Sequence, residues 1–211
     1  MQSVALIDYG SGNLRSAEKA LVRAAEGKAR IVVTSDPQVI AAADRVVLPG
    51  VGAFAACMAA LQAREGVIEA MTQAVRGRGV PFIGICVGMQ LMATRGLEFG
   101  ETAGLGWIAG DVRRIAPNDP AAKVPHMGWN ALLDVVDHPL FRSLKDGQPV
   151  YFTHSFAFFP EDSKDVAAYV DHGGRFPAAV VRANMAGVQF HPEKSQGAGL
   201  SLLSDFLEWR P

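Results

Sequence analysis

The sequence predicts an α/β fold with a doubly wound, mostly parallel central sheet and helices on both faces. In the N-terminal half, short apolar runs typical of buried parallel strands alternate with helical segments. After residue 149, short strand-like runs follow one another closely, which adds an antiparallel β region to the C-terminal half. The 211 residues, 49% of them hydrophobic, suffice for one sizeable core, so we expect a single domain over residues 1–211.

Composition and charge argue against several classes of protein. No apolar run approaches the roughly 18 residues of a membrane-spanning helix, and the N-terminal segment reads as a strand start, not a signal peptide. A net charge of −1 argues against binding to nucleic acid or to an acidic membrane. With only two cysteines, Cys57 and Cys86, we expect no disulfide scaffold and a cytoplasmic, reducing location.

The elements of the N-terminal half follow in order. Arg15 stands where a dinucleotide-binding loop at Gly10 and Gly12 would need its third glycine, so we set that interpretation aside. Asp36 and Pro37 open a short helix, because proline is tolerated at the first helical position. Besides that helix, we expect strands over residues 4–8, 30–34 and 45–48, with helices over residues 14–25 and about 54–64.

The pattern loosens between residues 96 and 125, where we expect short strands near Trp107 and at residues 111–115 and 123–124. His126 is interpreted as structural or as part of a recognition surface, and His172 as a turn residue. His138 begins a short helix and is expected to face solvent. Later strands are expected at residues 149–156, 166–170, 178–181 and 185–190, with a closing amphipathic helix over residues 197–209.

The run GICVGMQ at residues 84–90 is the most specific local signal. Residues 80–83 read as a buried strand and those from Met89 onward as a helix, which places Cys86 on the turn between them. Gly84 and Gly88 flank it as glycines flank the strained reactive residue of a nucleophile elbow. Free N–H groups at the helix start favour a thiolate. We interpret Cys86 as a nucleophile, and Cys57 as core or surface filler in the middle of a helix.

A base and its orienting group follow the last expected strand. Residues two apart in an extended chain face the same side, so the His191 imidazole can meet the Glu193 carboxylate, with Pro192 keeping the backbone extended. The carboxylate fixes the tautomer and leaves the other ring nitrogen to take a proton from sulfur. Zinc bound by Cys86, His191 and Glu193 is disfavoured by the single thiol. We expect no metal and no cofactor.

Two further segments suit a reaction site. The glycine-rich loop after the third strand can point the N–H group of Gly50, Val51 or Gly52 at a ligand, and with the N–H of Val87 it would form an oxyanion hole. An ordinary tight turn explains that loop equally well. The aromatic strand that ends near His154 suits a pocket wall.

Five segments together resemble class I (triad) glutamine amidotransferases and, more narrowly, the glutaminase subunits of imidazole glycerol phosphate synthase. The resemblance spans nearly the whole chain. Phe156 departs from a frequent tyrosine, which leaves the backbone contacts of its segment intact. The segments are DYGSGNL at residues 8–14, PGVG at 49–52, GICVGMQ at 84–90, KVPHMGWN at 123–130 and QFHPEK at 189–194.

The resemblance implies a reaction and a set of site residues. Cys86 would attack the side-chain amide of glutamine, His191 would protonate the leaving ammonia, and water would hydrolyse the thioester. The residues that match family positions around the glutamine are Gln90, Glu98, His154 and Ser155.

The resemblance also implies a partner, a (β/α)₈ cyclase subunit in a heterodimer. That subunit would use the ammonia to make imidazole glycerol phosphate and aminoimidazole carboxamide ribonucleotide in histidine biosynthesis. We expect the glycine-rich loop to present its oxyanion donor poorly until the partner and its ligand bind. The expected docking residues are Asn13, Arg15, Trp129 and Lys194.

Three alternatives stay open at this point. The chain could be another class I amidotransferase subunit or a cysteine hydrolase on the same fold. It could also be a non-catalytic scaffold that binds a cyclase, although all three residue types of a triad are present.

Overall fold

The computed structural model describes residues 1–211, and its larger sheet has nine strands in the order β2-β1-β3-β4-β13-β12-β11-β8-β9. The first five in this order run parallel: β2 (Ala29–Thr34), β1 (Gln2–Ile7), β3 (Arg45–Gly50), β4 (Phe82–Cys86) and β13 (Met185–Val188). The other four are antiparallel: β12 (Arg175–Arg182), β11 (Val166–Asp171), β8 (His126–Leu133) and β9 (Pro149–His154). The predicted parallel sheet with an antiparallel C-terminal extension is confirmed.

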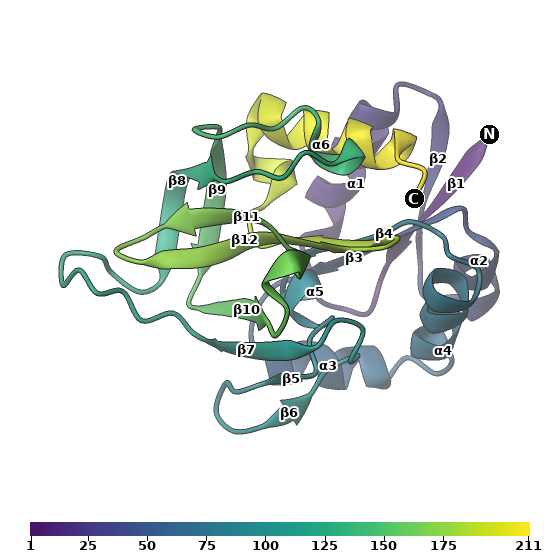
Figure 1. Cartoon of the computed structure of the whole chain (residues 1–211). Coiled ribbons are helices and arrows are strands. Elements are labelled where there is room, and N and C mark those ends of the chain that lie inside the picture. The colour runs from purple at the N-terminus through teal and green to yellow at the C-terminus, as the bar shows by residue number, and fades with distance from the viewer.

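Helices cover both faces of the parallel strands. On one face α1 (Leu14–Ala25) packs against α6 (Gln196–Glu208), and on the other α3 (Phe54–Gln62) and α2 (Pro37–Ala42) pack against α4 (Val67–Thr72), which continues into the π-helical turn η1 (Gln73–Gly77). Figure 1 shows α1 and α6 above the sheet and α3 and α4 below it. Every residue of β3 and β4 is buried. This double cover explains why these strands carry no polar side chain except Arg45 at the start of β3 and Cys86 at the end of β4.

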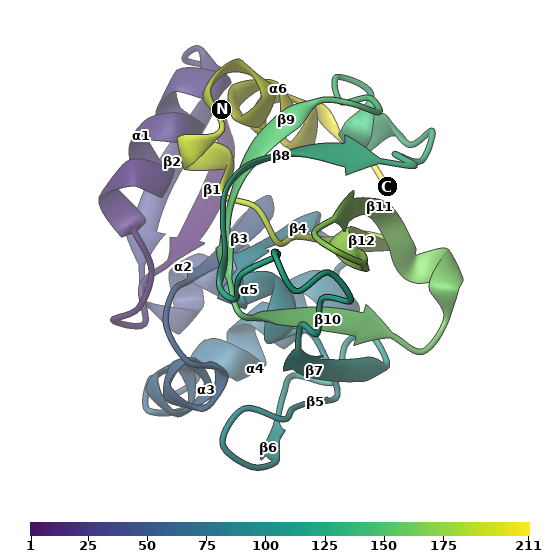
Figure 2. The same cartoon turned by 90° about the vertical axis from the view of Figure 1, so that its left-hand side faces the viewer.

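A second, smaller sheet has the order β10-β7-β5-β6. Its strands are β10 (Phe156–Pro160), β7 (Gly110–Arg114), β5 (Arg95–Gly96) and β6 (Thr102–Ala103). Only Ser155 separates β9 from β10, so the chain passes from one sheet to the other within a single residue. Figure 2 shows β9 running down into β10 beside the short helix α5 (Val87–Gln90). Short 3-10 turns complete the chain: η2 (Pro139–Phe141), η3 (Ser163–Asp165) and η4 (Pro192–Lys194).

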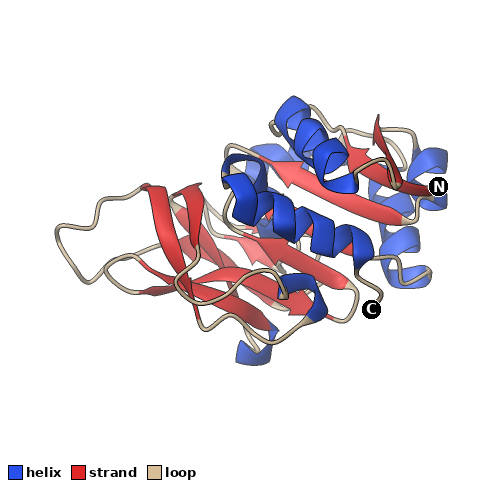
Figure 3. Cartoon of the chain, turned by 90° about the horizontal axis from the view of Figure 1, so that it is seen from above, coloured by secondary structure: helices blue, strands red, loops and turns tan.

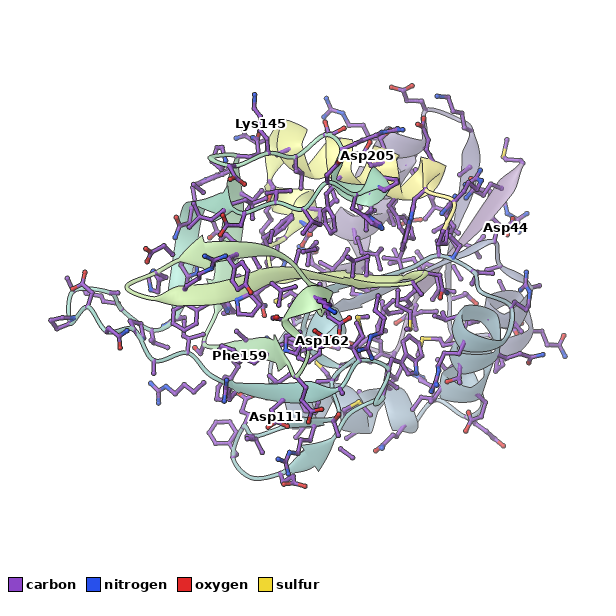
Figure 4. All side chains as sticks on the ribbon, viewed as in Figure 1. Asp44, Asp111, Lys145, Phe159, Asp162 and Asp205 are labelled. Atoms are coloured by element: carbon purple, nitrogen blue, oxygen red, sulfur yellow. The ribbon has the colours of Figure 1, made fainter.

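Both sheets share one core, a cluster of 61 buried apolar residues that runs from β1 to the end of α6. Figure 3, from above, shows α6 lying along the parallel strands while the antiparallel strands extend away from it. Asp205 of α6, labelled in Figure 4, is buried and accepts hydrogen bonds from Arg142 Nε at 2.8 Å and from Ser143 N at 2.9 Å. These bonds fasten the last helix to the turn after η2. None of the helices combines the length and the apolar character that a membrane crossing needs.

Several sequence predictions about local structure are wrong. Trp107 and residues 123–124 form no strand, and the Trp107 ring packs edge-on against Phe82 with centroids 4.9 Å apart. The strand predicted over residues 45–48 continues to Gly50, because pairing with β4 overrides the turn preference of Pro49 and Gly50. His138 is partly buried, since its Nδ1 accepts a hydrogen bond from Leu140 N and its ring packs against Trp209.

Candidate active site

Cys86 occupies a strained turn between β4 and α5. Its backbone has φ 53° and ψ −111°, a conformation that side chains rarely adopt. A Cβ atom on Gly88 would lie 1.8 Å from the Leu48 carbonyl oxygen, and one on Gly84 would lie 2.4 Å from the Gly88 carbonyl oxygen. Only glycine fits at either place, so the predicted elbow geometry is confirmed.

The register of the parallel strands brings the end of the chain to Cys86. Val188 of β13 pairs with Ile85 of β4, so the next residue, Gln189, lies beside Cys86. The buried Gln189 Nε2 donates to Cys86 Sγ at 3.6 Å. His191 follows two residues later and lines the same cavity as Cys86, with a volume of about 410 Å³. The sulfur and the imidazole predicted to work together therefore face one cavity.

His191 and Glu193 form a buried pair. His191 Nδ1 lies 2.8 Å from Glu193 Oε1, and the two side chains are only 2% and 4% exposed. The extended geometry predicted for this pair is wrong, because Pro192 begins the 3-10 turn η4 and that turn brings the carboxylate back to the ring. Nδ1–H donates to the carboxylate, which leaves Nε2 as the nitrogen for proton exchange.

The surroundings of His191 set its protonation state. Burial by itself lowers the pKa of the imidazole, but the Cys86 sulfur and the Glu193 carboxylate outweigh burial and raise the pKa to about 9. Nε2 is buried and makes no hydrogen bond of regular geometry to any other group. At neutral pH the ring therefore carries a proton beside the sulfur, where it can act as a general acid.

Replacing Glu193 by glutamine should shift the pH dependence of catalysis. Glutamine keeps an acceptor for Nδ1–H but removes the negative charge that raises the pKa of His191. We expect the alkaline limb of kcat/KM to move down by about one pH unit or more, because imidazolium is lost at lower pH. A pH–rate profile of both proteins checks this, and an unmoved alkaline limb would contradict it.

The same raised pKa makes a prediction about stability. The folded-state pKa of about 9 exceeds the ordinary value, so the imidazolium stabilises the fold fully below about pH 6.5. This contribution is lost as the pH rises through 9. The Glu193→Gln protein should lose less stability over that window than the parent in denaturant titrations.

Two residues that sequence reasoning did not assign to the site hold the reactive groups. Gln189 is fully buried and contacts the sulfur. Ser195 Oγ donates to the His191 carbonyl oxygen at 2.7 Å and accepts from Tyr151 N at 3.0 Å, while His191 N donates to the Tyr151 carbonyl oxygen. The polar Gln189 between the apolar residues Val188 and Phe190 is a sequence signal that could have indicated its role. No such signal marks Ser195, because its role depends on the approach of β9.

The segment after β3 approaches the elbow closely. Gly50 pairs with Cys86 in the β3–β4 register, and a Cβ atom on it would lie 2.9 Å from Val87 Cβ. Gly50 therefore serves close approach within a strand rather than loop freedom, which corrects the prediction of a loop over 49–52. Gly52, with φ +100°, is the position where the backbone itself favours glycine. Val87 is the first residue of α5, where N–H groups lack helical partners.

The Val51 carbonyl is held by two side chains. It accepts hydrogen bonds from Ser11 Oγ at 2.8 Å and from Cys57 Sγ at 3.3 Å. Cys57 lies in the core, which was one of the two places predicted for it, and it also donates a hydrogen bond. The side chain of Val51 is 42% exposed, and both Val51 and Gly52 line the cavity.

The predicted glutamine-binding residues all line this cavity, but their side chains differ in how many hydrogen-bonding atoms remain available to a ligand. Glu98 Oε2 accepts from Phe54 N at 2.8 Å. Gln90 Nε2 donates to the Phe156 carbonyl and to Gln189 Oε1. Both ring nitrogens of His154 are occupied within the protein, so its backbone is what remains for a ligand. The predicted members of the lining are Val51, Gly52, Cys86, Val87, Gln90, Glu98, His154, Ser155, His191 and Lys194, joined by Pro125, Thr153 and Phe156.

The four predicted docking residues are exposed. Asn13 and Arg15 lie at the start of α1. Trp129 is 48% exposed and packs edge-on against Tyr151, over which the Lys194 ammonium also lies at 5.6 Å. Lys194 and Trp129 thus share one aromatic neighbour beside the cavity. No grouping of three or more His, Cys, Asp or Glu side chains is arranged to hold a metal ion.

Comparison with known proteins identifies the family. The family model described as glutamine amidotransferase class-I matches residues 5–209. The chain belongs to the class-I glutamine amidotransferases. Members of this family that resemble it include proteins named imidazole glycerol phosphate synthase subunit HisH. The protein from Caulobacter vibrioides is 64% identical over the full length of both chains, and that from Ruegeria pomeroyi is 54% identical over 98% of this chain and 99% of its own.

Solved structures share the fold of this class-I amidotransferase. A crystal structure of a glutamine amidotransferase superposes with a TM-score of 0.72 at 19% identity and covers 97% of both chains. The structure of PurLQS from Thermotoga maritima superposes with a TM-score of 0.69 at 19% identity over 98% of both chains. The predicted fold class is confirmed.

Proposed function

We propose that this chain is the glutaminase subunit of an imidazole glycerol phosphate synthase, acting in histidine biosynthesis as one amidotransferase domain over residues 1–211. The observation that carries the proposal is the shared cavity of the elbow Cys86 and the buried His191–Glu193 pair. The assignment to imidazole glycerol phosphate synthase is supported by the names of two relatives that are 64% and 54% identical over nearly the whole chain. The two free cysteines suit a cytoplasmic location.

The proposed reaction proceeds in two halves. The Cys86 thiolate attacks the side-chain carbonyl carbon of glutamine, and the tetrahedral oxyanion is stabilised by the N–H of Val87 and one from residues 50–52. His191 Nε2–H protonates the nitrogen, the C–N bond breaks, and ammonia leaves. Water then attacks the glutamyl thioester, with neutral His191 taking its proton, and the C–S bond breaks so that glutamate leaves and the thiolate beside protonated His191 is restored. Glu193 holds the ring throughout.

The lining of the cavity suits a small zwitterionic amino acid. Glu98 has one carboxylate oxygen on the Phe54 N–H and a second without such a bond, which can accept from the α-ammonium group. Ser155 and Phe156, at the passage from β9 to β10, can bind the α-carboxylate through backbone N–H groups. A volume of about 410 Å³ admits glutamine but no folded peptide segment.

The proposed partner is the (β/α)₈ cyclase subunit, bound as a heterodimer on the face that carries Asn13, Arg15, Trp129 and Lys194. Lys194 is exposed and also lines the cavity, which supports a docking surface close to the proposed source of ammonia. We also propose that the Val51 carbonyl, held by Ser11 and Cys57, keeps the oxyanion donor poorly presented until the cyclase and its ligand bind.

Co-expression with a cyclase subunit tests this function. We expect the two chains to co-purify and the complex to cyclise its nucleotide substrate with glutamine as nitrogen source. The isolated chain should release little ammonia. Failure to co-purify, or equal glutaminase rates with and without the cyclase, would contradict the proposal, and cleavage of peptide substrates would favour a cysteine hydrolase.

A further inference from the structure

A continuous hydrogen-bonded chain links β8 to the reactive sulfur. Its first half joins Asn130, His126 and His154: Asn130 Nδ2 lies 3.2 Å from His126 Nε2, and His126 Nδ1 lies 3.0 Å from His154 Nε2. His154 Nδ1 lies 2.9 Å from the Phe156 carbonyl oxygen. Both histidines are buried, at 3% and 6% exposure.

The second half starts at that same carbonyl. The Phe156 oxygen also accepts from Gln90 Nε2 at 2.9 Å, and Gln90 Nε2 lies 3.0 Å from Gln189 Oε1. Gln189 Nε2 then donates to Cys86 Sγ. The Phe156 carbonyl is therefore the point where the histidine pair and the two glutamines meet.

The donors and acceptors of this chain can be assigned without ambiguity. A carbonyl only accepts, so His154 carries its proton on Nδ1 and its Nε2 is an acceptor. His126 must then donate from Nδ1 and accept at Nε2 from the Asn130 amide. The Asn130 orientation is fixed independently, since its Oδ1 accepts from Ala131 N and its Nδ2 also donates to the Asp171 carbonyl. Every link has one donor and one acceptor only while both histidines are neutral.

Protonation of either ring would break the chain. A second proton on His126 would face the Asn130 amide hydrogens, and one on His154 would face the His126 N–H. Burial, together with the neighbouring histidines, lowers the pKa of His126 to about 3. Burial also lowers that of His154 to about 4, with His172 and His191 adding to the effect and the Phe156 carbonyl opposing it. The rings thus stay neutral through the physiological range.

We propose that His126 is a positioning residue for the glutaminase site, acting through His154 on the Phe156 carbonyl and hence on Gln90 and Gln189. His126 touches neither the cavity nor Cys86. Its ring is fixed by stacking on Phe152 and His172, with centroids 4.7 Å and 4.1 Å away. Side chains alternate along β8, so Met127 and Trp129 are exposed while His126 is buried. The strand that carries the proposed docking residue Trp129 therefore also carries the first members of the hydrogen-bonded series.

Two substitutions of His126 separate positioning from packing. His126→Phe keeps an aromatic ring on Phe152 and His172 but removes both hydrogen bonds. His126→Asn loses the stacking but places an amide Nδ2 where the ring had Nδ1, and so restores the donor to His154. His138→Phe is the matched control, because His138 packs on Trp209 and has no bond to this chain.

The inference rests on the proposed function, and glutaminase kinetics of the cyclase complex test it. We expect His126→Phe to lower kcat about tenfold or more with little change in KM, His126→Asn to recover most of the loss, and His138→Phe to match the parent. In His126→Phe, His154 Nε2 no longer faces a donor and can accept a proton, so a new acidic limb should appear in its kcat profile. If His126→Phe has the kcat and the pH profile of the parent, the positioning role is overturned. Inactivity of Cys86→Ala in the same assay would show that the proposed function still holds.

Nitrogen NMR of the ¹⁵N-histidine-labelled full-length chain tests the assignment without any assay. We expect both His126 and His154 as neutral Nδ1–H tautomers at neutral pH, although free histidine prefers Nε2–H. An Nε2–H tautomer or a protonated ring at either position would overturn the chain as described. Loss of activity in His126→Asn, while His154 in that variant is still the neutral Nδ1–H tautomer, would also count against His126 acting through the donor to His154.

Discussion

Replacing Cys86 by alanine is expected to lower glutamine-dependent ammonia release by at least about 10⁴-fold, the scale seen when a nucleophile is removed from a triad. Alanine retains the Cβ atom that the elbow already accommodates, so the fold should remain. His191 and Glu193 would stay paired, but no atom in the cavity could form the thioester. Release of glutamate and ammonia by the complex with the cyclase is the measurement.

Free ammonia supplies the control for this experiment. The Cys86→Ala complex should still support cyclisation when ammonia replaces glutamine, because under the proposed function the cyclase active site belongs to the partner subunit. Residual glutaminase activity above about one per cent of the parent would exclude Cys86 as the nucleophile. Loss of the ammonia-dependent activity as well would indicate damage to the complex instead.

Replacing Gly88 by alanine is expected to have the largest effect on stability. The new Cβ atom would lie 1.8 Å from the Leu48 carbonyl oxygen, which belongs to the central strand β3 and cannot move without breaking its pairing. We expect a loss of more than about 3 kcal/mol in the free energy of unfolding, together with loss of glutaminase activity. Denaturant titration measures the first and the ammonia assay the second.

Gly197 provides the matched control for Gly88. It lies in α6, and nothing comes within 4 Å of a Cβ built on it. Alanine there should raise stability slightly, by up to about 1 kcal/mol, because alanine favours the helix. Equal unfolding free energies for Gly88→Ala and the parent would mean that the elbow does not approach β3 as closely as described.

The elements that sequence reasoning placed correctly are those whose cause is local. Helix α1 has the predicted bounds, residues 14–25, because its amphipathic pattern and the preceding glycine turn lie in one stretch of chain. The elbow was predictable for the same reason, since two glycines at fixed spacing accompany Cys86. The His191–Glu193 contact was predicted correctly but for the wrong geometry, because a 3-10 turn and an extended segment both bring residues two apart near each other here.

What sequence reasoning missed depends on strand register. Gln189 lies beside Cys86 only because β13 pairs with β4, and Ser195 supports His191 only because β9 lies next to η4. His126 and His154 are 28 residues apart and meet because β8 and β9 pair with those two residues opposite each other. No spacing rule within the chain predicts such contacts, since they follow from long-range pairing.

The proposed reaction depends above all on the transfer of the glutamyl group from glutamine to the Cys86 sulfur. Acid quenching of the cyclase complex during turnover, followed by mass spectrometry of its peptides, tests this transfer most directly. We predict a γ-glutamyl adduct on the peptide that contains Cys86, absent from the Cys57 peptide and absent when glutamine is replaced by ammonia. An adduct on Cys57, or turnover without any adduct on Cys86 at the shortest quench times, would contradict it.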